Sequence, residues 1–269
     1  MKHAISNIAL TPRSHLDELP VLAEMGFTGL EVAPSRIWED SWHGARAKSV
    51  DAYRLAAKSA GLEIVGLHSL LFDQPGLNLF ADAKGRRDML DFFVHLSGIC
   101  RDLGGRTLIW GGGRRRGDIS EDRARAITED FFAELSDRTE NDGTIFCLEP
   151  LAREDTDFLH SILETQEITQ VVGRAQLKVQ ADTKALAANG EINPMTFRKV
   201  AKELVHVHAN EPGFERLGDS GMVDHAAVGQ FLNEIDYSGY VSVEQKMIDS
   251  SDIFGPIGHS MALLRECYT

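Results

Sequence analysis

Three neighbouring runs decide the fold: EIVGLHS at residues 63–69, MLDFFVHLSGICRDLGG at 89–105 and TLIWGG at 107–112. The first and third are short and apolar with β-branched residues, which is typical of buried strands. The middle run places apolar side chains at helical spacing and ends in two glycines, which predicts a helix that stops at Gly104. A strand, a helix and a second strand joined by short connections require a parallel pair with a crossover helix.

The same alternation recurs along the whole chain. Further strands are predicted at HAISNI (3–8), TGLEVA (28–33), TIFCLE (144–149), LKVQAD (177–182), VHVHAN (205–210) and VSVEQK (241–246). Helices are predicted after an N-cap at Ser14, with a stop at Gly26, and around residues 127–135 and 228–235. Eight strand–helix units, without a GxGxxG loop in the first turn, favour an α/β fold of the (β/α)8 TIM-barrel type over an open doubly wound sheet. We expect a single TIM-barrel domain over residues 1–269.

Composition narrows the classes of function. The net charge of −13 disfavours nucleic-acid binding, which relies on Lys and Arg to neutralise phosphates. No apolar run approaches the roughly 20 residues of a membrane span, and the N-terminus lacks a signal-peptide pattern. Cys100, Cys147 and Cys267 are widely separated, which is typical of reduced, buried thiols. We therefore expect a cytoplasmic enzyme with neither nucleic-acid nor membrane partners. Both a monomer and a homo-oligomer are compatible with the sequence.

Polar residues end four consecutive predicted strands: Glu149, Asp182, His208 and Glu244. The carboxyl ends of barrel strands meet at one face, so these side chains are expected to lie together. Three carboxylates in one cleft repel one another, and a divalent cation removes that repulsion. Oxygen ligands with one imidazole suit one ion of Mn²⁺, Mg²⁺, Co²⁺ or Zn²⁺. His206 lies two residues before His208 on the same strand face, so we expect it to pack behind the site.

The strand ends LEP, QAD, HVHAN and VEQK, in this order, resemble those of the xylose isomerase-like TIM barrels. This superfamily contains sugar and sugar-phosphate isomerases and epimerases. The stretch GMVDHAAVGQFLNEIDYSGYVSVE (221–244) carries the strongest resemblance, and AEMGFTGLEV from Ala23 and AAKSAGLEIVGLHS from Ala56 are similar to the first repeats of the family. The resemblance covers essentially the whole chain, and its specificity comes from the ordered set of short motifs.

The resemblance implies a divalent-metal-dependent isomerase or epimerase of a ketose, sugar acid or sugar phosphate. In the family a carbon-bound proton is removed to give a metal-stabilised enediolate. By resemblance Glu149 and Glu244 are catalytic as well as metal ligands, and Asp182 and His208 are ligands. The alternative is a metal-dependent dehydratase or lyase of a cyclic polyol or shikimate-type substrate. An endonuclease acting at abasic DNA sites and a non-catalytic sugar-binding module are weaker alternatives.

Two candidate substrate contacts come from the resemblance. His68 matches a histidine that lines the pocket of many relatives, and Arg216 matches an arginine in the loop after strand seven. The chain departs from the family after Asp182, where a Thr and Lys184 stand in place of a histidine that contacts the substrate in many epimerases. Lys184 is therefore predicted to make that contact with a charged group. The side chain of Glu31, at the end of strand two, is predicted to lie either in the pocket or in the core.

Other candidates lie near the predicted mouth. Trp110, at the end of strand four, either stacks on a sugar or packs in the core. Lys246 shares a strand face with Glu244 if that strand continues. The basic run of residues 114–116 is either a solvated loop or, with Lys184 and Lys246, a site for a phosphate or carboxylate. These cations favour an anionic sugar derivative among the small carbohydrate substrates.

Overall fold

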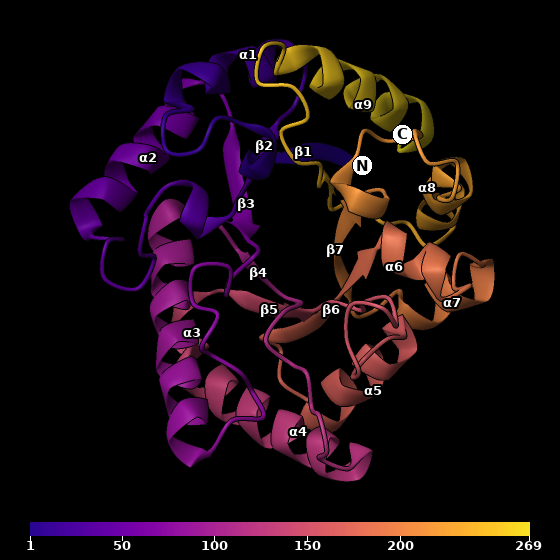
Figure 1. The fold of residues 1–269 in the computed structure, drawn as a ribbon. Coiled ribbons are helices and arrows are strands. Elements are labelled where there is room, and N and C mark those ends of the chain that lie inside the picture. Colours follow the sequence, from indigo (N-terminus) through magenta and orange to yellow (C-terminus); the bar gives the residue numbers. More distant parts are fainter.

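Eight parallel strands close into a barrel in the computed structural model, which describes residues 1–269 (Figure 1). The strands are β1 (Lys2–Ser6), β2 (Gly29–Val32), β3 (Glu63–Leu67), β4 (Thr107–Trp110), β5 (Ile145–Leu148), β6 (Leu177–Asp182), β7 (Leu204–Ala209) and β8 (Tyr240–Val243). Neighbours in sequence are neighbours in the sheet, and β8 pairs with β1 to close the ring. The predicted (β/α)8 barrel is confirmed.

Helices surround this ring, as the view along the barrel shows (Figure 1). They are α1 (Leu19–Glu24), α2 (Ala47–Ser59), α3 (Ala83–Leu103), α4 (Glu121–Arg138), α5 (Ile162–Val172), α6 (Thr183–Ala188), α7 (Pro194–Val200), α8 (His225–Glu234) and α9 (Phe254–Cys267). Short 3-10 turns are Asn7–Ala9, Leu16–Glu18, Pro34–Arg36, Glu140–Asp142 and Pro212–Phe214. The apolar faces of the helices pack on the outside of the barrel in a cluster of 57 buried residues.

The longest helix shows how local sequence sets its limits. The Asp82 side chain accepts a hydrogen bond from the amide of Gly85 at 2.8 Å and caps the start of α3. Gly104 ends it with φ +86°, a conformation that costs glycine little. The N-cap predicted at Ser14 is wrong, because the first turn there begins after His15 and no side chain caps it.

Most predicted strands extend one to three residues too far at their carboxyl ends. β8, for example, stops at Val243, and β5 stops at Leu148. Each strand ends where its hydrogen-bonded pairing with a neighbouring strand ends. A sequence pattern does not show where this pairing stops. The pairing register also shifts between Leu30 and Glu31, and between Val179 and Gln180. Such irregularities change the direction of the side chains that follow.

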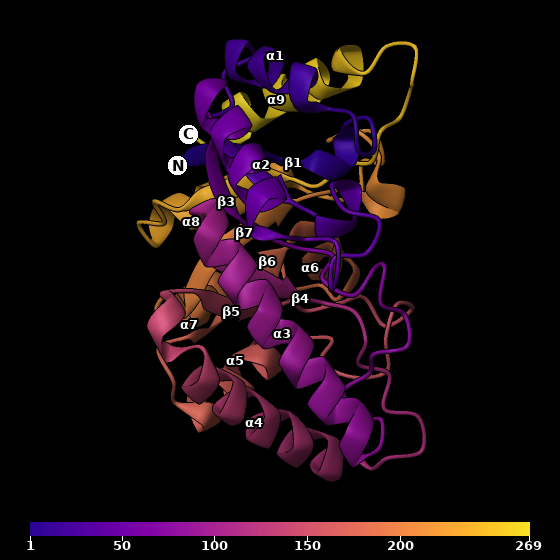
Figure 2. The same cartoon turned by 90° about the vertical axis from the view of Figure 1, so that its left-hand side faces the viewer.

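Both chain ends lie at the amino-terminal end of the barrel (Figure 2). There the ring of His3 donates from Nε2 to the backbone carbonyl of Tyr268 at 2.8 Å. Cys100 and Cys147 are buried and Cys267 is half-buried, and all three are free thiols. None of the helices has the length and apolar character that a membrane span requires. The opposite end of the barrel, where the strands finish, carries the polar residues described next.

Candidate functional site

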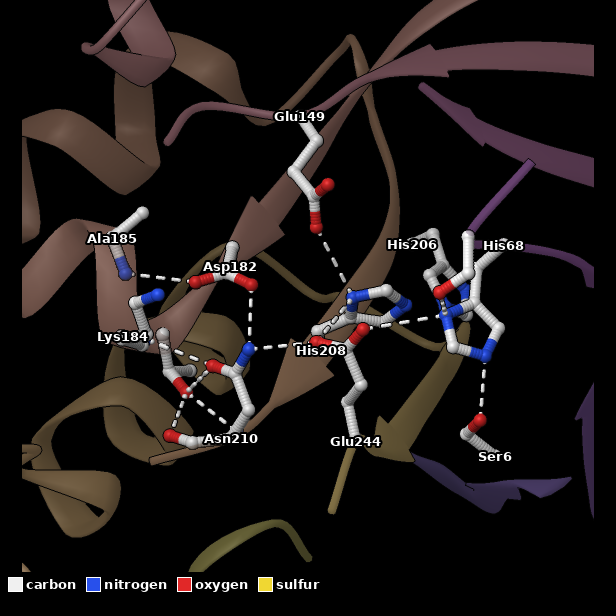
Figure 3. Close-up of polar contacts among 12 residues, drawn as sticks. Ser6, His68, Glu149, Asp182, Lys184, Ala185, His206, His208, Asn210 and Glu244 are labelled. Carbon is white, nitrogen blue, oxygen red and sulfur yellow. Dashed lines mark hydrogen bonds and ion pairs between the residues drawn. The ribbon is translucent and has the colours of Figure 1, made fainter. Parts of the chain in front are cut away.

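The four polar strand ends meet at the carboxyl end of the barrel (Figure 3). Asp182 ends β6 and pairs with His208 of β7 in the ladder, while Glu149 and Glu244 directly follow β5 and β8. One donor atom from each side chain lies within 4.8 Å of the others, and all four residues are buried. The structure therefore brings together the whole predicted ligand set.

The imidazole of His208 lies at the centre of this cluster. Its Nδ1 is 3.3 Å from Oε1 of Glu149 and 3.4 Å from Oε2 of Glu244. Its Nε2 is 3.0 Å from the carboxylate of Glu31, which is completely buried behind it. His206 Nε2 lies 3.0 Å from the same carboxylate. Glu31 thus holds the Nε2–H of His208 and leaves Nδ1 directed at the cluster, the arrangement typical of a metal-ligating histidine.

A buried amide separates two of the carboxylates. Nδ2 of Asn210 donates to Oδ2 of Asp182 at 2.6 Å and to Oε2 of Glu244 at 2.8 Å. Its Oδ1 accepts from the Thr183 hydroxyl and from the backbone amide of Lys184. Because both ends of the amide are bonded, its orientation is fixed and it fixes the two carboxylates in turn.

The electrostatics of the cluster show why a cation fits it. Burial, and then the neighbouring charges of Glu149 and Glu244, raise the pKa of Asp182 to about 8. Burial opposes ionisation of Glu244 as well, but His208 and His68 outweigh it and hold its pKa below the usual range. Burial lowers the pKa of His208, and the charges of Glu31 and Glu244 more than reverse this and raise it well above its usual value. Without a metal the cluster thus retains protons, and a divalent cation would take their place.

His68 directly follows β3 and connects the cluster to β1. Its Nε2 is 2.5 Å from the hydroxyl of Ser6, and its Nδ1 is 3.3 Å from Oε1 of Glu244. The ionised carboxylate of Glu244 can only accept, so Nδ1–H of His68 donates to it. In the neutral ring Nε2 is then an acceptor, and the Ser6 hydroxyl donates to it.

A cavity of about 320 Å³ opens above these residues. One side is polar and formed by the ends of β5 to β8. The other side is largely apolar and comes from the loop after β3, with Leu70, Leu71, Phe72, Pro75 and Leu77, and from the end of β4. A small ligand in the cavity would therefore contact charged groups on one side and hydrocarbon on the other.

One glycine marks the place where the two sides meet. A Cβ atom at Gly111, directly after β4, would overlap Oε2 of Glu149, whereas nothing lies within 4 Å of one at Gly112. Glu149 therefore occupies space that only glycine leaves free. Its Oε1 faces His208 and its Oε2 lies along Gly111, which lines the cavity.

Of the predicted substrate contacts, the structure places His68, Trp110 and Lys184 in the cavity wall. Trp110 does so with only 1% of its surface exposed, and its ring packs edge-on against Phe132 at 5.0 Å, so the core position predominates. Lys184 forms an ion pair with Asp155.

Arg216 and Lys246 do not line the cavity. Arg216 is paired with Asp219 at 2.8 Å, and Lys246 with Glu215 at 2.7 Å. The prediction for Lys246 assumed that strand alternation continued beyond Glu244, and β8 has already ended there. The Arg216 side chain turns back to Asp219 within its own loop, whereas Phe214 of the same loop lines the cavity.

The basic run of residues 114–116 binds its own chain. Arg114 is buried, and its guanidinium donates to the carbonyl of Leu159 at 3.0 Å. Arg115 and Arg116 donate to backbone carbonyls of residues 154–157. These three arginines thus hold the loop after β5 in place through hydrogen bonds. None of the three lines the cavity.

The sequence did not point to three residues that the structure places at the site: Asn210, Gly111 and Asp155. Asn210 could have been found, because it shares a strand face with His206 and His208. Glu31, for which two positions were open, lies behind the ligand cluster. Asp155 lies in an irregular loop, and no periodic pattern marks it.

The sequence profile of the xylose isomerase-like TIM barrels matches residues 19–267, and the chain belongs to this family. No curated protein sequence matches it significantly. Among solved structures, D-psicose 3-epimerase from Clostridium cellulolyticum H10 superimposes with a TM-score of 0.84 at 17% identity, covering 100% of this chain and 99% of the other. For 3-keto-D-glucoside 4-epimerase from E. coli the TM-score is 0.83 at 20% identity, with 99% and 100% coverage. An AP endonuclease, family 2, from Brucella melitensis gives 0.76 at 18% identity, with 99% of each chain covered. At these identities the likeness establishes the shared fold.

Proposed function

We propose that this chain is a divalent-metal-dependent isomerase or epimerase that moves a carbon-bound proton of a ketose-type sugar. One observation carries the proposal: Glu149, Asp182, His208 and Glu244 converge at the floor of the cavity with their donor atoms within 4.8 Å. Family membership supports it, and the structural neighbours named as sugar epimerases favour proton transfer over loss of water.

The ligand set suits a hard or borderline cation, with three carboxylates and one imidazole nitrogen. When bound, the cation would polarise the carbonyl of the sugar and stabilise the negative charge that develops on its oxygen. Mn²⁺, Mg²⁺, Co²⁺ and Zn²⁺ all fit this description, so metal analysis of the purified protein decides among them.

The two glutamates differ in their surroundings, which suggests different roles. Glu149 directs Oε1 at His208, and no side chain donates a hydrogen bond to Oε2 beside Gly111, so that oxygen is available to take a proton. Both oxygens of Glu244 are engaged, Oε2 by Asn210 and Oε1 by His68. We assign Glu149 as the base that removes the proton. On the other side, Glu244 would return a proton that it receives from Nδ1 of His68.

Exchange with solvent tests the proposal directly. Metal-free protein is incubated in D2O with added Mn²⁺ and four ketohexoses in turn: D-fructose, D-psicose, D-tagatose and D-sorbose. We expect loss of a carbon-bound proton signal in the NMR spectrum and a new sugar product, and neither after EDTA treatment. Release of water with an unsaturated product would instead identify the dehydratase alternative, and cleavage of abasic DNA would identify an endonuclease.

A further inference from the structure

We propose that the ion pair between Asp155 and Lys184 selects an uncharged sugar and rejects sugar phosphates and sugar acids. The inference rests on the proposed function, since it names the substrate class of the same cavity. It departs from the expectation drawn from the basic residues alone, which favoured an anionic derivative.

The pair is part of the cavity wall. Lys184 lies in the first turn of α6, two residues after Asp182, and Asp155 lies in the loop after β5. Nζ of Lys184 is 2.7 Å from Oδ2 of Asp155, and the two side chains are 16% and 36% exposed. The ammonium also lies 5.6 Å from the centre of the Phe214 ring. The Lys184 ammonium is thus already paired with a group of opposite charge.

No other fixed cation replaces it. Lys184 is the only Lys or Arg among the residues that line the cavity. Arg216 and Lys246 are paired with acidic neighbours outside it, and the run of residues 114–116 is bonded to backbone carbonyls. A phosphate or carboxylate in the cavity would find no unpaired ammonium or guanidinium to bind.

The remaining charges act against an anion. Besides Asp155, the wall contains the carboxylates of Glu149, Asp182 and Glu244. With these four ionised, one lysine and one divalent cation leave the cavity about one charge negative, and a further anion would be repelled. A neutral sugar avoids that repulsion. The ammonium can donate a hydrogen bond to one hydroxyl, and the Asp155 carboxylate can accept one from another.

A charge-removing substitution tests the inference. Asp155→Asn keeps the size of the side chain, removes the negative partner and leaves Lys184 free. Exchange in D2O is measured with Mn²⁺ for the four ketohexoses above and for their 1- and 6-phosphates, using wild type, Asp155→Asn and the control Glu154→Gln. Glu154 is exposed and adjacent, and its side chain makes no ion pair or hydrogen bond, so the control removes an equal charge without freeing Lys184.

For wild type we expect kcat/KM to be at least about tenfold higher for a free ketohexose than for its phosphates. In Asp155→Asn this preference should fall by about tenfold, and in Glu154→Gln by less than about twofold, since an exposed charge is screened. Preference of wild type for the phosphates, or a ratio that Asp155→Asn leaves unchanged, would overturn the inference while the proposed function stands. Failure of every free and phosphorylated sugar to exchange would overturn both.

Discussion

The two sides of the barrel mouth are built differently. The carboxyl ends of β5 to β8 supply all four proposed metal ligands, and all four side chains are buried. Glu31 holds His208, and Asn210 holds Asp182 and Glu244. The side after β3 and β4 supplies loop residues, mostly apolar, and Phe72 at its rim is 78% exposed. Charges that must lie a few Å apart need the rigidity of strands, while a wall that only shapes the cavity does not. The predictions below test this division, from the largest expected effect to the smallest.

Removing one charge from the side of the mouth formed by β5 to β8 should reduce activity the most. Glu149→Gln keeps the shape of the side chain and removes the proposed base, so we expect kcat to fall by about 10²–10⁴-fold with an unchanged circular dichroism spectrum. Glu154→Gln, in the same loop, should retain activity. A fully active Glu149→Gln enzyme would remove Glu149 from the mechanism.

A substitution at Gly111, where the two sides of the mouth meet, should reduce activity almost as much. In Gly111→Ala the new methyl group displaces the Glu149 carboxylate, and we expect kcat to fall by about 10²-fold, as small misplacements of a reacting group do. Gly112→Ala is the matched control, because its methyl group meets nothing within 4 Å. Equal activities of the two variants would show that the position of Glu149 is not critical.

The residue behind the ligands should affect metal binding. Glu31→Gln removes the charge that holds the Nε2–H of His208, and we expect the affinity for Mn²⁺, measured by calorimetry, to fall by about 10–100-fold. Excess Mn²⁺ should restore much of the activity, which distinguishes this role from that of Glu149. An unchanged affinity would reduce Glu31 to a packing role.

The pH should change metal binding through the same cluster. Below pH 8 the carboxyl group of Asp182, with its pKa raised to about 8, retains a proton that the metal must displace. The affinity for Mn²⁺ should therefore rise with pH by up to about tenfold per unit, and level off for this group near pH 8. Calorimetry in buffers of different ionisation enthalpy reports the protons released.

Stability of the metal-free protein should change in the opposite sense. The raised pKa of Asp182 means that its contribution to stability is fully present below the pKa of the unfolded chain and is lost as pH rises to about 8. The melting temperature in EDTA should fall over this range, and added Mn²⁺ should reverse the fall. A melting temperature that rises with pH would contradict the raised pKa.

The loop side should give the smallest response. Phe72→Ala removes an exposed ring at the rim, and we expect KM to rise by about threefold with kcat nearly unchanged, because little apolar area is lost. A loss of kcat as large as that of Gly111→Ala would show that the loop takes part in the reaction, and would break the comparison.

Much of this site was predictable because it lies on regular elements. The period of the fold predicts that four residues meet, because each lies at or next to the carboxyl end of one of four successive strands: Glu149, Asp182, His208 and Glu244. Lys246 shows the limit of that reasoning, since alternation applies only as far as the strand extends, and β8 ends at Val243. Asp155 was not predictable, because its loop has no period from which its position could be inferred.

The sequence alone determined the eight strand–helix units and the order of the polar strand ends, because hydrophobic periodicity and end signals are local properties. Only the tertiary structure decided which atoms face one another: Nδ1 of His208 toward the carboxylates, the amide of Asn210 between two of them, and Lys184 paired with Asp155. These contacts join residues distant in sequence through strand registers and loop paths. Charge on the sequence suggested an anionic substrate, and pairing in three dimensions removed the cations on which that suggestion depended.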